Sequence, residues 1–261
     1  MDIIVCIKQV PDTTEVKIDP KTNTLVRQGV PSIVNPFDKN AVEAALRLKE
    51  QYGGKVTVLS MGPPQANDAL KECLAMGADD AVLISDRAFG GADTLATSYT
   101  LAASIRKLGH YDIIICGKQA IDGDTAQVGP EMAEHLGIAQ LTYVAKIEVK
   151  GDTVRVNREH ENGYEVIEAK LPVLISAVKS LNVPRYPTVK GILRAVRAKI
   201  QVHAASDLDV EPDRLGLKGS ATQVREIFTP PQRTQGVMIR KESAGASVSE
   251  LMQKLSDAKI V

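Results

Sequence analysis

Short apolar runs alternate with amphipathic segments along the first half of the chain. Four runs have the length of buried strands: Ile3–Ile7, Val56–Ser60, Ala81–Ile84 and Tyr111–Cys116. Between them, apolar residues recur at helical spacing, as they do over residues 66–77. We therefore predict a mostly parallel, doubly wound (Rossmann-like) α/β sheet with helices on both faces.

The first predicted helix begins at Asn35-Pro36-Phe37-Asp38. Asn is a favoured N-cap residue, proline fits the first helical position, and an acidic residue in the first turn complements the helix dipole. We expect this helix to run to about Tyr52. Upstream, apolar residues at positions 16, 18, 25 and 26 flank a turn at 19–23 and predict a small hairpin.

The pattern changes after Gly137. Strand-like segments occupy residues 141–149, 153–159 and 164–170, and the Asn-Gly pair at 162–163 is a strong hairpin signal. A buried apolar run follows at residues 172–177. We predict that this block extends the same sheet and adds antiparallel strands to it.

From Gln201 the core pattern is lost, because prolines and glycines punctuate the chain and few apolar residues fall between them. Residues 246–259 return to helical spacing. The apolar face of that helix consists of Val248, Leu251, Met252 and Leu255. We divide the chain into an α/β domain at residues 1–200 and a C-terminal arm at residues 201–261 that packs on a partner chain. A disordered tail is the alternative.

One loop of the predicted sheet has the features of an anion-binding site. In sheets of this kind, ligands bind at the carboxyl ends of the strands. The stretch from Gly117 to Gly129 leads from a strand into a helix and contains three glycines. Such a loop places backbone N–H groups at a helix N-terminus, where a phosphate can bind. Its pattern is neither G-x-G-x-x-G nor G-x-x-x-x-G-K-[ST]. A capped loop that binds nothing is the alternative.

The composition excludes several classes of function. Lys+Arg and Asp+Glu both number 32, and there is no Trp. Because nucleic-acid binding needs a basic surplus or an aromatic platform, we predict no nucleic-acid partner. The three cysteines, Cys6, Cys73 and Cys116, fall on apolar segments and lack metal-ligand spacing, so we expect them to be buried and predict no metal site. The sequence has no recognisable signal peptide and no apolar run of membrane length, which indicates a cytoplasmic protein without a membrane span.

Five motifs, in order along nearly the whole chain, resemble those of the β (small) subunit of an electron-transfer flavoprotein. They are residues 5–12 (VCIKQVPD), 35–38 (NPFD), 75–79 (AMGAD), 117–124 (GKQAIDGD) and 180–186 (SLNVPRY). The resemblance implies a heterodimer with an α subunit, on which the C-terminal arm packs. It also implies an adenine nucleotide that lies across the strand ends.

The resemblance implies a set of nucleotide contacts in this chain. They fall on Cys6, Asn35, Pro36, Phe37, Asp38, Met61, Gly123, Asp124, Thr125, Ala126, Gln127, Val128, Gly129, Pro130 and Glu131, and extend to Glu134. The backbone N–H groups of residues 124–126 are expected at the phosphates, with the side chains of Thr125 and Gln127. Asp122 is expected to cap its turn, because a carboxylate repels an anion.

The kind of nucleotide depends on a second segment. In most members of the family it is AMP, and in the electron-bifurcating branch it is a second FAD. Residues 89–97 (FGGADTLAT) resemble the bifurcating branch, so we predict FAD, with AMP as the alternative. This part of the site comprises Phe89, Gly90, Gly91, Asp93, Thr94 and Thr97. The two glycines are expected to open space for the isoalloxazine ring, and the polar side chains to hydrogen-bond its edge. For Asp93, a helix cap is the alternative.

The chain offers no convincing acid–base pair and no activated nucleophile, so the flavin would supply the redox chemistry. The resemblance implies NADH as the electron donor. Ferredoxin or flavodoxin would receive one electron, and an acyl-CoA dehydrogenase the other through a flavin on the α subunit.

Residues 180–186 resemble the docking loop of the family. The expected contacts are Leu181, as an exposed apolar anchor, with Asn182, Pro184, Arg185 and Tyr186. A plain surface loop is the alternative. For the whole protein, a non-redox nucleotide sensor and an ATP-cleaving hydrolase remain as other classes, although the hydrolase lacks a phosphate-binding lysine motif.

Overall fold

The computed structural model describes residues 1–12, 18–19, 24–25, 31–225 and 236–261. The chain divides into two compact units, Met1–Arg225 and Glu226–Val261, and each is described by itself. The strands of the first unit are β1 (Asp2–Cys6), β2 (Gln9–Pro11), β3 (Ile18–Asp19), β4 (Thr24–Leu25), β5 (Ser32–Val34), β6 (Lys55–Met61), β7 (Asp80–Ile84), β8 (Ile113–Gly117), β9 (Ala139–Lys150), β10 (Thr153–His160), β11 (Gly163–Lys170), β12 (Val173–Ala177) and β13 (Gln201–His203). Its α-helices are α1 (Pro36–Tyr52), α2 (Asn67–Met76), α3 (Thr94–Leu108), α4 (Val128–Leu136) and α5 (Val189–Arg197). Its 3₁₀ helices are η1 (Pro64–Ala66), η2 (Arg87–Phe89), η3 (Lys179–Leu181), η4 (Ala205–Asp207) and η5 (Pro212–Arg214). The second unit contains α6 (Ala244–Asp257).

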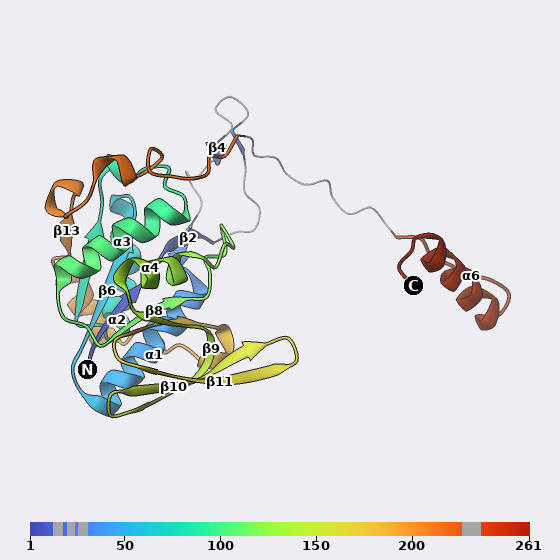
Figure 1. Ribbon diagram of the computed structural model, residues 1–261, viewed down its shortest axis with the longest axis horizontal. Coiled ribbons are helices and arrows are strands. Elements are labelled where there is room, and N and C mark those ends of the chain that lie inside the picture. Colours follow the sequence, from blue (N-terminus) through green and yellow to red (C-terminus); the bar gives the residue numbers. More distant parts are fainter. Residues whose placement is uncertain (13–17, 20–23, 26–30, 226–235) are drawn as a thin grey trace. The chain divides into compact units, whose positions relative to one another are not determined.

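Nine strands form one sheet in the order β11-β10-β9-β12-β8-β1-β6-β7-β13 (Figure 1). The strands β9, β12, β8, β1, β6, β7 and β13 pair with their neighbours in parallel. At the other end of the sheet, β10 pairs antiparallel with both β9 and β11. This confirms the predicted, mostly parallel sheet with added antiparallel strands. The short strands β3 and β4 also pair antiparallel, which confirms the predicted hairpin. Its flanking positions 16 and 26 and its turn at 20–23 lie outside the described residues.

The side chains of the central strand β1 alternate between two cores. Ile3 and Val5 face the core that α1 and α2 complete, whereas Ile4 and Cys6 face the core that α3 and α4 complete. Helices therefore cover both faces of the sheet, as predicted. Each fully buried aliphatic side chain contributes about 1.5–3 kcal/mol to the stability of this arrangement. The cysteines are all buried, which confirms that expectation, and burial raises the pKa of each thiol.

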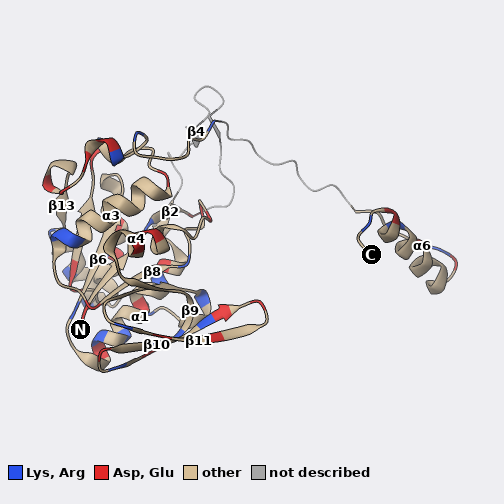
Figure 2. Cartoon of the chain, in the orientation of Figure 1, with Lys and Arg blue, Asp and Glu red and all other residues tan. Residues whose placement is uncertain are grey.

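Opposite charges face each other across the antiparallel strands (Figure 2). Arg155 is paired in register with Glu168, and Arg158 with Glu165, and in each pair the closest nitrogen and oxygen are 3.7 Å apart. All four side chains are exposed to solvent. Each pair therefore contributes little to stability, although like charges at these positions would disfavour this register.

The division of the structure differs from the predicted boundary after residue 200. Strand β13 pairs with β7, so residues 201–203 belong to the sheet. Leu208 and Leu215 are buried in the same core as Tyr99 of α3, whose hydroxyl accepts a hydrogen bond of 2.9 Å from the backbone N–H of Glu211. These apolar residues are too widely spaced to form a periodic pattern, which is why the sequence pattern did not assign them to the core.

The second unit contains the predicted C-terminal helix, α6. Its N-cap is Ser243, whose hydroxyl oxygen accepts a hydrogen bond of 3.2 Å from the backbone N–H of Ala246. No residue of α6 is buried, and Val248, Leu251 and Met252 are exposed. The packing of this helix on a partner chain stays a prediction.

Candidate functional site

The parallel register brings the predicted site loops to one edge of the sheet. Cys6 at the end of β1 is level with Leu59 of β6 and with Cys116 of β8. Met61 at the end of β6 is level with Ile84 of β7. The segments that follow these strands therefore start side by side at the carboxyl edge of the sheet, where ligands bind in sheets of this kind.

Asn35 connects the start of α1 to the loop after β8. Its side-chain amide nitrogen donates to the carbonyl oxygen of Gln119 (2.8 Å), and its side-chain oxygen accepts from the backbone N–H of Ile121 (3.2 Å). Asn35 occupies the N-cap position, as predicted, but its side chain makes no capping hydrogen bond to the helix. The side chain is fully buried, so both of its polar groups serve to hold the loop.

Asp38 holds two strand-end loops at once. One carboxylate oxygen accepts from the backbone N–H of Lys8 (2.7 Å) and the other from that of Gly117 (3.0 Å). Burial raises the pKa of Asp38 to about 7, against hydrogen bonds from Lys8, Asn35 and Gly117 that favour the charged form. The polar side-chain atoms of Asn35 and Asp38 are thus engaged with the protein itself. Their predicted contact with a nucleotide stays a prediction.

The loop before α4 presents backbone N–H groups that have no partner among the described residues. Asp124 and Ala126 both have positive φ, 50° and 54°. Ala126 is followed by Gln127 in right-handed helical conformation at the N-cap of α4, where its side chain makes no capping bond. A left-handed residue next to a right-handed one forms a concave cluster of N–H groups that suits an anion. Within the described part of the chain, the N–H groups of Thr125 and Ala126 find no acceptor, whereas that of Asp124 donates to Ala120 (2.9 Å).

These features fit a phosphate-bearing nucleotide. Left-handed backbone at a residue other than glycine costs about 1–3 kcal/mol and is concentrated at functional sites. Gly129 lets α4 approach the sheet closely, because a Cβ there would lie 2.9 Å from Sγ of Cys116. Two of the three predicted phosphate N–H groups, those of residues 125 and 126, have no acceptor in the described parts of the chain, and the third is used within the loop.

Residues 89–97 form the second predicted part of the site. Phe89 is buried in the core, so its ring does not line an open surface. A Cβ on Gly91 would lie 3.2 Å from Cβ of Leu217, and the N–H of Leu217 donates to the carbonyl oxygen of Gly90 (3.0 Å). Leu217 therefore lies on the side of Gly91 to which a Cβ would point, and space for an isoalloxazine ring at these glycines stays a prediction.

Asp93 caps α3 and also holds a distant segment. One carboxylate oxygen accepts from the N–H of Ala96 (3.1 Å), and the other from the N–H and the hydroxyl of Thr222 (2.9 and 3.1 Å). Burial raises the pKa of Asp93, but these hydrogen bonds outweigh burial and bring the pKa below its usual value. The cap is confirmed. A flavin contact of Asp93 stays a prediction.

Thr94 joins the two predicted parts of the site. Its hydroxyl donates to Oε1 of Glu131 (3.1 Å), which lies in the first turns of α4. The other carboxylate oxygen of Glu131 is buried and has no partner among the described residues. The structure thus brings residues 94 and 131 together, as the predicted site requires. Thr97 donates its N–H to the carbonyl oxygen of Asp93 (3.0 Å).

The predicted docking loop is held against α1. Arg185 pairs with Glu43 (2.7 Å) and Glu50 (2.5 Å), and the side-chain amide of Asn40 donates to the carbonyl oxygen of Asn182 (2.7 Å). Burial raises the pKa of Glu43, but hydrogen bonds from Arg185 and Arg47 outweigh burial and bring the pKa below its usual value.

The expectation of an exposed Leu181 is wrong. Its side chain is half-buried and packs against the core that α1 completes, because η3 turns it inward. The exposed apolar residues of the loop are Val183 and Tyr186, which are 81% and 91% exposed. Pro184 is half-buried between them.

One residue near the site was not in the predicted set. Lys8 follows β1, and its ammonium nitrogen lies 2.7 Å from Oδ1 of Asp122 in the loop after β8. Asp122 was expected to cap its turn, and its carboxylate instead meets this cation. The signal in the sequence was the lysine directly after the first strand, which a search for a contiguous phosphate-binding motif passes over.

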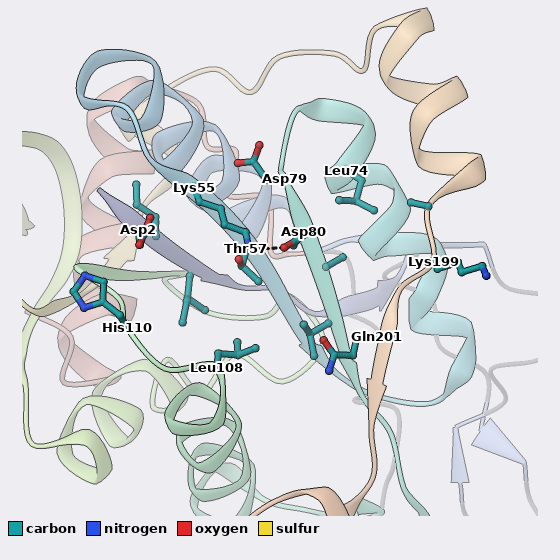
Figure 3. A pocket seen from close by; sticks show the side chains of 15 residues that line it. Asp2, Lys55, Thr57, Leu74, Asp79, Asp80, Leu108, His110, Lys199 and Gln201 are labelled. Atoms are coloured by element: carbon teal, nitrogen blue, oxygen red, sulfur yellow. Dashed lines mark ion pairs between the residues drawn. The ribbon is translucent and has the colours of Figure 1, made fainter.

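The opposite edge of the sheet carries a cavity of about 510 Å³ at the amino ends of β1, β6 and β7 (Figure 3). Two of its charged lining residues, Lys55 and Asp80, form an ion pair of 2.5 Å. Within the described residues, no group of His, Cys, Asp and Glu side chains could hold a metal ion. No described helix has the length and apolar character that crossing a membrane requires.

Comparison with known proteins gives one consistent result. Residues 22–208 match the model of the electron transfer flavoprotein domain. The chain is 60% identical to "Electron transfer flavoprotein subunit beta" of Clostridium acetobutylicum, over 97% of this chain and 99% of the relative. It is 53% identical to "Caffeyl-CoA reductase-Etf complex subunit CarD" of Acetobacterium woodii and 49% identical to "Acryloyl-CoA reductase electron transfer subunit gamma" of Anaerotignum propionicum, each over 97% of this chain and 99% of the relative. The chain therefore belongs to the electron transfer flavoprotein family and, within it, to the β subunits.

Proposed function

We propose that this β subunit pairs with an α subunit and binds FAD at the carboxyl edge of its sheet, as part of an electron-bifurcating flavoprotein. The observation that carries the proposal is the cluster of N–H groups at residues 125 and 126, which no described residue binds and which Thr94 and Glu131 join to the segment at 89–97. The cluster suits the phosphates of a dinucleotide, and the joined segment lies next to it, where the rest of the cofactor would continue.

The residues of this chain have distinct tasks in the proposal. The N–H groups of Thr125 and Ala126 bind phosphate oxygens, because they have no acceptor within the described residues and lie directly before the N-terminus of α4. Met61, at the end of β6, is only partly buried and offers apolar contact for the adenine ring. The side chain of Cys6 is buried in the core, so its contribution is to support the end of β1. Asn35 and Asp38 keep the two strand-end loops in position around it.

A flavin held at this edge by these residues would supply the redox chemistry, with NADH as the electron donor. The acceptors in this proposal are ferredoxin or flavodoxin and, through a flavin on the α subunit, an acyl-CoA dehydrogenase. The protein contributes position and electrostatics. The names of two relatives support a partner that reduces an acyl-CoA, since one belongs to a caffeyl-CoA reductase complex and the other to an acryloyl-CoA reductase.

A second candidate is an electron transfer flavoprotein that holds a structural AMP at this edge. The observation in its favour is Leu217, which fills the space beside Gly91 and would have to move for a ring to lie there. The test is to denature the pure heterodimer and to quantify the nucleotides released. Two FAD per heterodimer support bifurcation, whereas one FAD and one AMP support the second candidate. A complex without visible flavin absorbance would instead indicate a non-redox nucleotide sensor.

A further inference from the structure

The loop proposed to bind phosphate is rich in negative charge. Asp122, Asp124 and Glu131 lie on it or directly after it, and Glu134 follows on α4. A phosphate bound at the N–H groups of residues 125 and 126 would approach several carboxylates. Backbone N–H groups carry only partial charges, so a full positive charge close by would make a large difference to the affinity.

Lys8 is the side chain in the right place to provide that charge. Its ammonium group lies 2.7 Å from Oδ1 of Asp122, three positions before Thr125 in the sequence. In the part of the chain that the structure describes, no other lysine or arginine has an ion pair or hydrogen bond to residues 119–131. Lys118 directs its ammonium over the ring of Tyr143, 5.0 Å from the centroid.

The backbone and the side chain of Lys8 have separate roles. Its N–H is fixed by Asp38 at 2.7 Å, which holds the end of β1 in place. Its side chain is 50% exposed, and that of Asp122 is 26% exposed. Ion pairs with this much solvent contact contribute little to stability, so the ammonium can turn from Asp122 at small cost. A lysine ammonium is also a compact charge on a flexible stem, which suits a phosphate that approaches from solvent.

We propose that Lys8 is a phosphate-binding residue of this site, held by Asp122 until the nucleotide enters. With the nucleotide bound, the ammonium lies between the carboxylate of Asp122 and the phosphate that the N–H groups of Thr125 and Ala126 hold. The inference rests on the proposed binding of a phosphate-bearing nucleotide, and it is the same for FAD and for AMP. It assigns Asp122 the role of orienting the lysine.

The experiment compares two ligands that differ only in the phosphate. The purified heterodimer is stripped of nucleotide, and the binding of AMP and of adenosine is measured by calorimetry. Lys8→Met should weaken AMP binding by about tenfold or more, because a charge-assisted hydrogen bond is lost. It should leave adenosine binding unchanged, and Lys8→Arg should retain most of the affinity for AMP. Lys55→Met is the matched control, because Lys55 is 52% exposed and pairs with Asp80 at the opposite edge of the sheet.

The outcomes separate this inference from the function on which it rests. Equal losses for AMP and adenosine in Lys8→Met would mean that Lys8 shapes the loop without binding phosphate, and would overturn the inference. Unchanged AMP affinity would overturn it too, while the proposed function would stand. A wild-type heterodimer that binds neither AMP nor FAD would overturn both.

Discussion

Asp38 accepts a hydrogen bond of 2.7 Å from the backbone N–H of Lys8, thirty positions earlier in the chain. Its other carboxylate oxygen accepts from Gly117, so one buried side chain joins the ends of β1 and β8. Lys8 in turn reaches Asp122 with its side chain. The position of the proposed phosphate loop relative to the first strand therefore depends on the start of α1.

The ionisation of Asp38 should make stability depend on pH. Burial raises its pKa from 3.8 to about 7, so the folded protein binds a proton that the unfolded chain has lost in this range. The contribution of Asp38 is therefore fully present below pH 4 and is lost as the pH rises towards 7. Asp38→Asn removes this dependence. Between pH 5 and 8, the free energy of unfolding of the wild type should fall by roughly 1–3 kcal/mol relative to the variant, measured by urea denaturation. Parallel curves would show that Asp38 has an ordinary pKa.

His203 should give the opposite dependence. It is 3% exposed, and neither ring nitrogen has a partner among the described residues. Burial lowers its pKa, so the folded protein keeps the ring neutral while the unfolded chain takes up a proton below about pH 6.5. Stability is then lost as the pH falls below that value. His203→Leu should remove this loss, and the exposed His160→Gln serves as the control. An equal acid sensitivity in His203→Leu and wild type would contradict the prediction.

The alternation of apolar and polar residues was enough to predict the sheet, because burial repeats with a period that depends only on local geometry. That local pattern does not predict contacts between segments that lie far apart in the sequence. The side chain of Asn35 looked like a helix cap and holds a loop 84–86 positions away. Leu181 looked exposed because its neighbours are polar, yet η3 turns it to the core. Leu217 was assigned to an arm and packs on Gly91. Each error concerns a partner that no local pattern specifies.

Gly117 should not tolerate a side chain. A Cβ there would lie 2.7 Å from Cβ of Phe37 and would also overlap Oδ1 of Asp38. Gly117→Ala should therefore destabilise the protein by roughly 1–3 kcal/mol and weaken nucleotide binding, because the loop after β8 must shift. Gly123→Ala is the control in the same loop, since a Cβ there meets nothing within 4 Å. Thermal unfolding of both variants checks the prediction, and equal midpoints would contradict it.

The bond between Asp93 and Thr222 allows the cap and the flavin contact to be separated. The hydroxyl of Ser220 accepts from the backbone N–H of Asp93 (2.8 Å), and the hydroxyl of Thr222 donates to the carboxylate of Asp93 (3.1 Å). The double variant Ser220→Ala and Thr222→Val removes both bonds and leaves the carboxylate and its helix cap intact. Hydrogen exchange of residues 216–225 should become faster, by an amount that corresponds to about 0.5–1.5 kcal/mol per bond. The flavin content should stay unchanged. Asp93→Ala should also lose the helix cap, and it loses flavin only if Asp93 contacts the cofactor. Unchanged exchange in the double variant would show that these bonds do not hold the segment.

The predicted docking loop has two candidate anchors that mutation can distinguish. Tyr186 is 91% exposed, so Tyr186→Ala should leave the thermal midpoint unchanged. It should slow electron delivery from the heterodimer to an acyl-CoA dehydrogenase, while NADH oxidation by an artificial acceptor continues at the wild-type rate. Leu181→Ala should instead lower stability by roughly 1–3 kcal/mol, because the side chain packs against the core. Stopped-flow reduction of the dehydrogenase measures the first effect and thermal unfolding the second. If Leu181→Ala slowed delivery at full stability, and Tyr186→Ala did not, the anchor would be the leucine after all.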